Sequence, residues 1–174
     1  MKKELTRRSF LKLAGVGALA VAMSGSLTGC DVIDNLKDMD SVSATIGDVK
    51  FMLSASAWVN NGSNGMSYQP TCEIRNNSKK AVTYGGIGSN CEVIITGVLT
   101  DKNGKEYPMT YAGENGSAPA GEKYEVKDFK LVAVGKELHV EGSKVETTFT
   151  YKGYKGKKAV FTEYYDGNIT SKVE

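Results

Sequence analysis

The 174-residue sequence has only one histidine and three cysteines, and these shortages exclude several classes of function. A copper site needs two histidines, and the sequence has one. A Ser-His-Asp triad would have to use that residue, His139, which lies in an alternating stretch typical of an exposed strand. The sequence Asp101-Lys102-Asn103-Gly104 lacks the acidic residue that would complete a calcium loop, and a hairpin turn explains it better. We therefore expect no enzymatic activity, no metal and no cofactor.

The chain also lacks a strongly basic field. Its net charge is +2, but the five basic residues and one acidic residue of positions 1–29 carry +4, which leaves −2 for the rest. A nucleic-acid-binding surface needs clustered positive charge and stacking aromatic residues. Neither pattern occurs beyond residue 29, so nucleic acid is not an expected partner.

The first 29 residues have the layout of an export signal, with a basic start followed by an uncharged run from Leu13 to Gly29. A transmembrane helix is the alternative, but this run is rich in glycine and serine. The stretch Thr6-Arg7-Arg8-Ser9-Phe10-Leu11-Lys12 resembles the twin-arginine export signal, in which Arg7, Arg8, Phe10 and Leu11 are the matching residues. The resemblance implies export across a bacterial cytoplasmic membrane.

The next motif, Leu27-Thr28-Gly29-Cys30, resembles the lipobox of bacterial lipoproteins. The resemblance implies cleavage before Cys30 and lipidation of its thiol, with two acyl chains holding the protein on the outer face of the membrane. An uncleaved tail with a free cysteine is the alternative. We expect a signal peptide over residues 1–29, a lipidated cysteine and polar spacer over 30–41, and one domain over 42–174.

Beyond residue 41 the hydrophobic pattern has period two and no convincing helix, which predicts an all-β domain. In one run, Val145, Thr147, Phe149 and Tyr151 alternate with polar residues. A change of phase predicts a bulge near Asp128. The expected strands cover residues 42–53, 67–75, 80–84, 91–100, 105–111, 122–134, 137–141, 144–152 and 157–165.

Many short antiparallel strands favour a sandwich. Residues 42 to about 166 resemble the immunoglobulin-like β-sandwich of small bacterial surface lipoproteins, as in the strand-turn-strand pattern of residues 72–82. The antibody order of Cys, Trp and Cys is missing, because Trp58 precedes both Cys72 and Cys91. The expected fold is a single antiparallel immunoglobulin-like β-sandwich.

Strand counting sorts the connections into two ends. The tight turns at Asn76–Lys80 and Asp101–Gly104, and the lysine-rich turn at Lys152–Lys157, are expected at the end nearer the anchor. Loops 54–66, 85–90 and 112–121 are expected at the far end, where such folds usually bind ligands.

With Cys30 assigned to lipid, Cys72 and Cys91 remain as an even pair in an exported chain. Each shares its strand face with an apolar residue, so both thiols are expected to point inward. We predict a disulfide between them, which would stabilise the domain by roughly 3 kcal/mol. Two buried free thiols are the alternative.

Trp58 is the candidate ligand contact, because a lone tryptophan among Ser, Asn and Gly is an efficient contact for sugar or protein. Asn60, Asn61 and Tyr84 belong to or flank the same far loops. The alternative is that Trp58 covers one edge of the core. We expect a non-enzymatic lipoprotein that binds an extracellular protein or glycan, with a solute- or metal-handling accessory protein as the other possibility.

Overall fold

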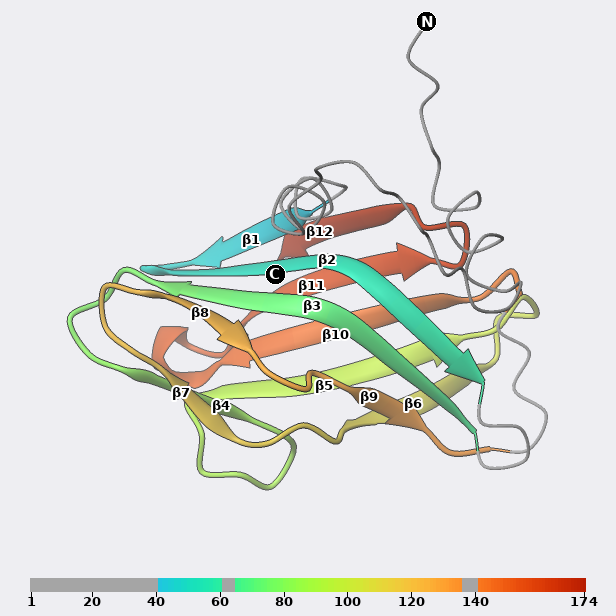
Figure 1. The fold of residues 1–174 in the computed structure, drawn as a ribbon, viewed down its shortest axis with the longest axis horizontal. Helices are drawn as coiled ribbons and strands as arrows, with labels where there is room; N and C mark the ends of the chain where they lie inside the picture. Colours follow the sequence, from blue (N-terminus) through green and yellow to red (C-terminus); the bar gives the residue numbers. More distant parts are fainter. Residues whose placement is uncertain (1–40, 61–64, 136–140) are drawn as a thin grey trace, which may run out of the picture.

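The computed structural model describes residues 41–60, 65–135 and 141–174, and these residues form an all-β domain with no α-helix. The expectation of a predominantly antiparallel all-β domain is confirmed (Figure 1). The predicted signal peptide, Cys30, the spacer as far as residue 40, Asn61 and most of the predicted strand 137–141 lie outside the described residues. The strands are β1 (Val42–Ile46), β2 (Val49–Asn60), β3 (Met66–Asn76), β4 (Val82–Gly85), β5 (Val93–Thr100), β6 (Glu106–Tyr111), β7 (Gly116–Ala118), β8 (Lys123–Val126), β9 (Leu131–Ala133), β10 (Lys144–Tyr151), β11 (Lys157–Tyr164) and β12 (Ile169–Val173).

The strands belong to one sheet whose main path runs β1-β2-β3-β9-β6-β5-β10-β11-β12. The sheet curls until its two edge strands meet, as Figure 1 shows for β1 and β12. The Ser171 hydroxyl on β12 donates a hydrogen bond of 2.9 Å to the Ser43 carbonyl on β1. The result is a nearly closed, barrel-like sheet. The expected immunoglobulin-like sandwich of two separate sheets is not confirmed, because the hydrogen-bonded path is continuous.

Two expected strand boundaries are corrected. The expected strand over residues 42–53 is a hairpin, because Gly47 takes a left-handed backbone conformation (φ 58°) and reverses the chain between β1 and β2. The expected strand over residues 122–134 is two strands, β8 and β9, separated near Asp128, which is also left-handed (φ 52°). The predicted irregularity near Asp128 is thus a full break in the strand.

Between β3 and β5 the wall of the sheet divides into two branches. In one half β8 pairs with β3, while β7 pairs with β4 and β4 with β5. In the other half β9 and β6 complete the wall. Aromatic side chains fill the region of the division, where Tyr84 packs near Tyr124 and Tyr111 packs on Phe129.

The interior is filled by side chains from facing walls. Phe149 on β10 stacks on Phe51 of β2 with ring centroids 4.9 Å apart, and it meets Phe161 of β11 edge-on at 5.6 Å. All three rings are almost completely buried. Burial of each such ring contributes about 2 to 3 kcal/mol, so burial of these apolar side chains is the main stabilisation between the facing strands of the sheet.

The strands define two ends of the molecule. At the end on the left of Figure 1 lie the β1–β2, β3–β4 and β10–β11 connections, and we call it the lysine end. At the opposite end lie the β2–β3, β5–β6 and β11–β12 connections, and we call it the tryptophan end.

The expected end is correct for two of the three turns. Asn76–Lys80 and Lys152–Lys157 share the lysine end, but Asp101–Gly104 lies at the opposite end. The reason is that β4 runs parallel to β5, so the chain returns to the lysine end before β5 begins. If every strand is assumed to be antiparallel to the one before it, each turn after β4 is assigned to the wrong end. The assignment becomes correct again only after a second pair of successive strands that run in the same direction.

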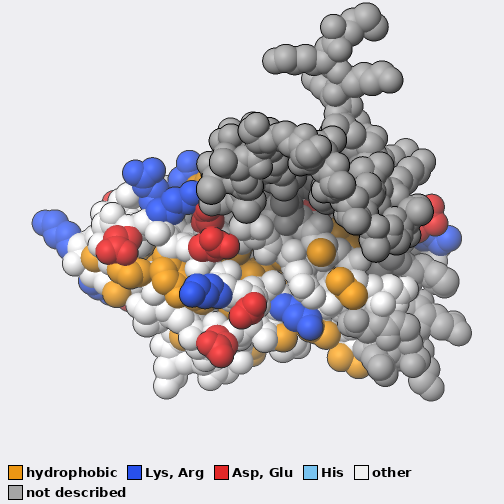
Figure 2. All heavy atoms as spheres, viewed as in Figure 1, with side chains coloured by type: hydrophobic (Ala, Val, Ile, Leu, Met, Phe, Trp, Pro, Cys, Tyr) orange, Lys and Arg blue, Asp and Glu red, His pale blue; other side chains and the backbone are white. Residues whose placement is uncertain are grey.

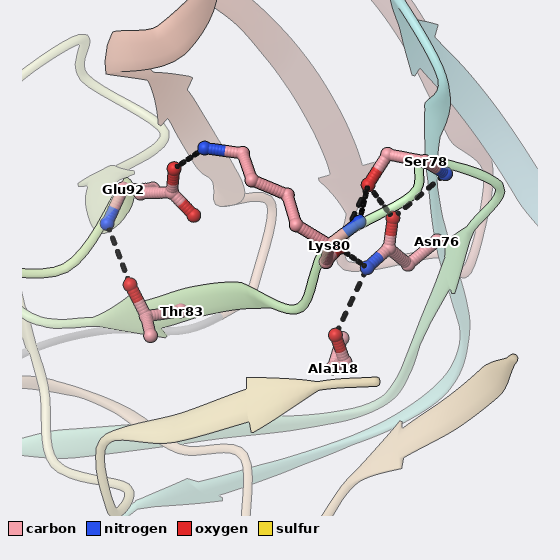
Figure 3. Close-up of polar contacts among 6 residues, drawn as sticks. All are labelled: Asn76, Ser78, Lys80, Thr83, Glu92 and Ala118. Carbon is pink, nitrogen blue, oxygen red and sulfur yellow. Dashed lines mark hydrogen bonds and ion pairs between the residues drawn. The ribbon is translucent and has the colours of Figure 1, made fainter. Parts of the chain in front are cut away.

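A buried amide secures the lysine end (Figure 3). The Asn76 side chain is fully buried, and its Nδ2 donates to the carbonyl oxygens of Lys80 at 2.8 Å and Ala118 at 3.0 Å. Its Oδ1 accepts from the backbone N–H of Ser78 at 3.0 Å and from the Ser78 hydroxyl at 2.6 Å. The amide thus satisfies backbone groups of the β3–β4 turn and of β7 together.

Candidate binding site

The tryptophan end begins with a bulge in β2. The pairing of β2 with β3 shifts register between Ser54 and Ser56. Before the shift, Phe51 and Leu53 point into the core, and after it the inward positions are Ser56 and Trp58. A bulge adds one residue to a strand and thereby redirects the side chains that follow. Here it brings a hydroxyl and an indole to the inner face.

Glu163 on β11 faces these two side chains across the interior. It follows Ala159 and Phe161 on the inner face of the strand, and only 2% of its surface is exposed. The Tyr68 hydroxyl on β3 donates a hydrogen bond to its Oε2 at 2.7 Å. The Ser56 hydroxyl donates a second to its Oε1. Burial of a carboxyl group requires such donors, because the group has lost its hydration.

The indole of Trp58 is fixed by the same cluster. Its Nε1 lies 3.2 Å from the Ser56 hydroxyl oxygen and 3.5 Å from Glu163 Oε1. Its ring meets Tyr68 edge-on at 5.6 Å and Tyr165 edge-on at 5.7 Å. Trp58 is half-buried and packs against the core. The ring is therefore held in one orientation while part of it faces solvent.

One partly exposed ring borders Trp58. Tyr165 meets the indole edge-on and is 44% exposed, whereas Val59 and Tyr164 follow Trp58 and Glu163 on their strands and point to the opposite, outer face. A partly exposed aromatic pair of this kind is suited to contact a sugar ring or an apolar protein surface.

The carboxyl group of Glu163 makes its contacts within the protein. Both of its oxygens accept hydrogen bonds from protein groups, and the side chain is shielded from solvent. We call the set of Ser56, Trp58, Tyr68, Glu163 and Tyr165 the Trp58 cluster.

No protein-family model, curated protein or solved structure matches this chain. Within the described residues, no helix is long and apolar enough to cross a membrane. In the same residues, no three His, Cys, Asp or Glu side chains lie together in a group suited to a metal ion.

The structure brings together only part of the predicted ligand site. Trp58 and Asn60 lie on β2 rather than in a loop, and Asn60 is exposed at the strand end. Asn61 lies outside the described residues. Tyr84 is far along the chain on β4 and only 3% exposed. Tyr84 belongs to the hydrophobic core, and burial, with a hydrogen bond to Tyr124, raises its pKa.

The structure does not show the predicted disulfide, and Cys72 and Cys91 are both free thiols in it. Cys72 lies on β3 and Cys91 two residues before the start of β5. Burial, with a smaller effect of the charge on Glu73, raises the pKa of the Cys72 thiol well above its usual value. A protonated thiol is a poor nucleophile, so this environment opposes oxidation.

The same burial acts on Tyr111, which lies between the two branches of the wall. Its hydroxyl donates to the Glu114 carbonyl at 3.0 Å, and desolvation raises its pKa to about 12. Cys72, Tyr84 and Tyr111 thus belong to the hydrophobic core.

Sequence reasoning missed four members of the Trp58 cluster, namely Ser56, Tyr68, Glu163 and Tyr165. One signal was available for Glu163, because it occupies the same alternating face as Ala159 and Phe161. A carboxyl group in the phase of buried residues indicates a specific buried role.

Proposed function

We propose that this protein is a bacterial envelope lipoprotein that binds an extracellular protein or glycan through its tryptophan end. The address rests on the sequence, in which the Arg7-Arg8 signal and the motif ending at Cys30 occur in the order that export and lipidation require. An anchored domain with a fixed aromatic contact is suited to adhesion or scaffolding.

The observation that carries the binding role is the fixation of Trp58. Its indole N–H lies within hydrogen-bond distance of the Ser56 hydroxyl, and its ring meets Tyr68 and Tyr165 edge-on. Part of the ring still faces solvent. A contact that is already ordered before binding loses little entropy when a partner arrives. Aromatic side chains with these properties commonly dominate binding energy.

The described residues favour this role over the metal-handling alternative. They contain no cluster of metal-ligating side chains, and the Glu163 carboxyl is occupied by hydroxyl and indole donors.

The test compares Trp58→Ala with Ile87→Ala, which removes an exposed apolar side chain outside the Trp58 cluster. Residues 30–174 carrying Cys30→Ser would be applied to an array of bacterial envelope glycans and cross-linked to intact cells. We expect Trp58→Ala to weaken binding at least tenfold and Ile87→Ala to leave it unchanged. Because Trp58→Ala also removes packing, Trp58→Phe serves as the variant that keeps the fold. Equal binding by the parent, Trp58→Ala and Trp58→Phe would refute the proposal.

A further inference from the structure

The turn between β10 and β11 concentrates exposed positive charge. It runs through the short 3₁₀ turn η2 (Lys152–Tyr154) to the start of β11, with the sequence Lys-Gly-Tyr-Lys-Gly-Lys-Lys over residues 152–158 and no acidic residue. Lys152, Lys155 and Lys157 are all exposed, and none of them forms an ion pair with a described residue. Their charges face water.

The turn is held against the rest of the lysine end by Tyr154. Its ring packs on Gly47 in the β1–β2 turn, where a Cβ atom would overlap it, and it lies 5.1 Å from the Tyr151 ring. Tyr154 is 37% exposed. The lysines are thus carried on an anchored turn that also presents an aromatic edge.

The neighbouring sheet surface adds a second group of cations. On the outer face, Lys50 of β2 is directly opposite Arg75 of β3, and Arg75 is directly opposite Lys123 of β8. Figure 2 shows Lys and Arg side chains standing out at the left end of the molecule. We call Lys50, Arg75, Lys123, Lys152, Lys155 and Lys157 the basic surface.

Two features of the basic surface oppose stability. Lys155 has a left-handed backbone conformation (φ 55°), which glycine adopts at lower cost. Lys50 and Arg75 lie directly opposite on adjacent strands, and their like charges repel.

The acidic groups nearby neutralise only part of this charge. Glu73 pairs with Lys123 at 2.7 Å, Glu92 with Lys80 at 2.6 Å, and Glu174 with Lys172 at 2.5 Å. Glu125 lies directly opposite Glu73, on the same outer face as Arg75 and Lys123. Asp48 lies in the β1–β2 turn close to Tyr151. Glu174 also interacts electrostatically with Lys158, which is why Lys158 is left out of the basic surface.

We propose that the basic surface docks onto the anionic lipid headgroups of the membrane that carries the anchor. This inference rests on the lipoprotein address of the proposed function, because a lipid at Cys30 keeps the domain near a bilayer. Residues 30–41 span at most about 40 Å when extended, so the bilayer stays within reach of the lysine end. Lysines and a partly exposed tyrosine are the side chains that favour a headgroup region. Docking at the lysine end turns the Trp58 cluster outward.

The test uses vesicle binding with an unlipidated protein, so that its result does not depend on the anchor. All described strands and the core lie within residues 42–173, so residues 30–174 with Cys30→Ser retain the whole domain. This protein would be sedimented with vesicles of phosphatidylglycerol and phosphatidylcholine, and with phosphatidylcholine alone. The variant is Lys152→Gln/Lys155→Gln/Lys157→Gln. The matched control is Lys102→Gln/Lys105→Gln/Lys127→Gln, which removes the same charge from exposed lysines away from the basic surface.

We expect binding only to the anionic vesicles, with weaker binding at high salt. Each lysine near an anionic surface contributes about fivefold in affinity, so the triple variant should lose on the order of a hundredfold. The control variant should bind within a few fold of the parent.

Equal binding by the triple variant and the parent, or equal binding to neutral vesicles, would overturn the proposal. Absence of vesicle binding together with lysine-dependent binding to an anionic polysaccharide would also overturn it and identify a polyanion as the partner. The glycan and cross-linking test of Trp58 is unaffected by any of these outcomes.

Discussion

The two ends of this barrel-like sheet bury different kinds of polar side chain. At the tryptophan end an acidic residue, Glu163, is buried and surrounded by hydroxyl and indole donors. At the lysine end the buried polar group is a neutral amide, Asn76, and the charged side chains stay in water. Burial of an amide with all its partners costs little, whereas burial of a carboxyl group carries a larger desolvation penalty.

The two ends also differ in whether a polar group stabilises the fold or is available for an interaction. Asn76 satisfies backbone groups of a turn, and this is a purely structural task. Burial of Glu163 carries a desolvation penalty, and the buried carboxyl group holds the partly exposed Trp58 ring in place. Lys152, Lys155 and Lys157 form no ion pair with a described residue, which leaves their charge available to a partner.

The largest effect is expected from Glu163→Ala. Loss of the carboxyl group leaves the Tyr68 and Ser56 hydroxyls without their acceptor and opens a cavity beside Trp58. We expect the free energy of unfolding to fall by about 3 kcal/mol, measured by urea denaturation. The emission of Trp58, the single tryptophan of the chain, should shift to longer wavelength.

Glu163→Gln is the control for shape. It keeps an acceptor oxygen and most of the volume, so we expect about half the loss of stability. If Glu163→Ala is as stable as the parent and leaves the Trp58 emission unchanged, the proposed locking of Trp58 is wrong.

An intermediate effect is expected from Asn76→Ala at the other end. The substitution removes two bonds donated to carbonyl oxygens and two accepted from Ser78. We expect a loss of about 2 kcal/mol in urea denaturation, with no change in the Trp58 emission of the folded protein. Asn103→Ala, in the exposed turn after β5, should change stability by less than about 0.5 kcal/mol. A shift of the Trp58 emission in folded Asn76→Ala would show that the two ends are not independent.

The smallest effect is expected from Lys155→Gly. Glycine relieves the left-handed backbone of Lys155 but increases the freedom of the unfolded chain, so a net gain of about 0.5 kcal/mol should appear in the same assay. Lys152→Gly, at a position without a positive φ, should instead lose stability. Equal destabilisation by the two substitutions would remove the argument that Lys155 is kept at a cost. Lys155→Gly should at the same time weaken binding to anionic vesicles.

Much of the fold was predictable because the period-two pattern is clear where a strand has one buried face. Val145, Phe149 and Tyr151 on β10 are buried as their alternation predicts. The segment after Leu53 was predicted as a loop because its small polar residues have little strand propensity. Pairing with β3 across the bulge makes it a strand, and this tertiary contact overrides local preference. The parallel step of β4 has no local signal at all.

The candidate site was predictable only in part. Trp58 stood out from composition, and Glu163 could have been found from its phase with Phe161. The participation of Tyr68 depends on its register opposite Trp58, and that of Ser56 depends on the bulge. Both are set by pairing between strands, which a single sequence does not specify.

The most direct test of the account is the intact mass of the natively expressed protein from the membrane fraction, with alkylation before and after reduction. Export and lipidation decide whether the lysine end meets a bilayer and whether the Trp58 cluster meets extracellular partners. The account predicts the mass of residues 30–174 plus lipid, with Cys72 and Cys91 alkylated in the denatured protein without reduction. An unprocessed chain without lipid would contradict the proposed localisation and the function built on it.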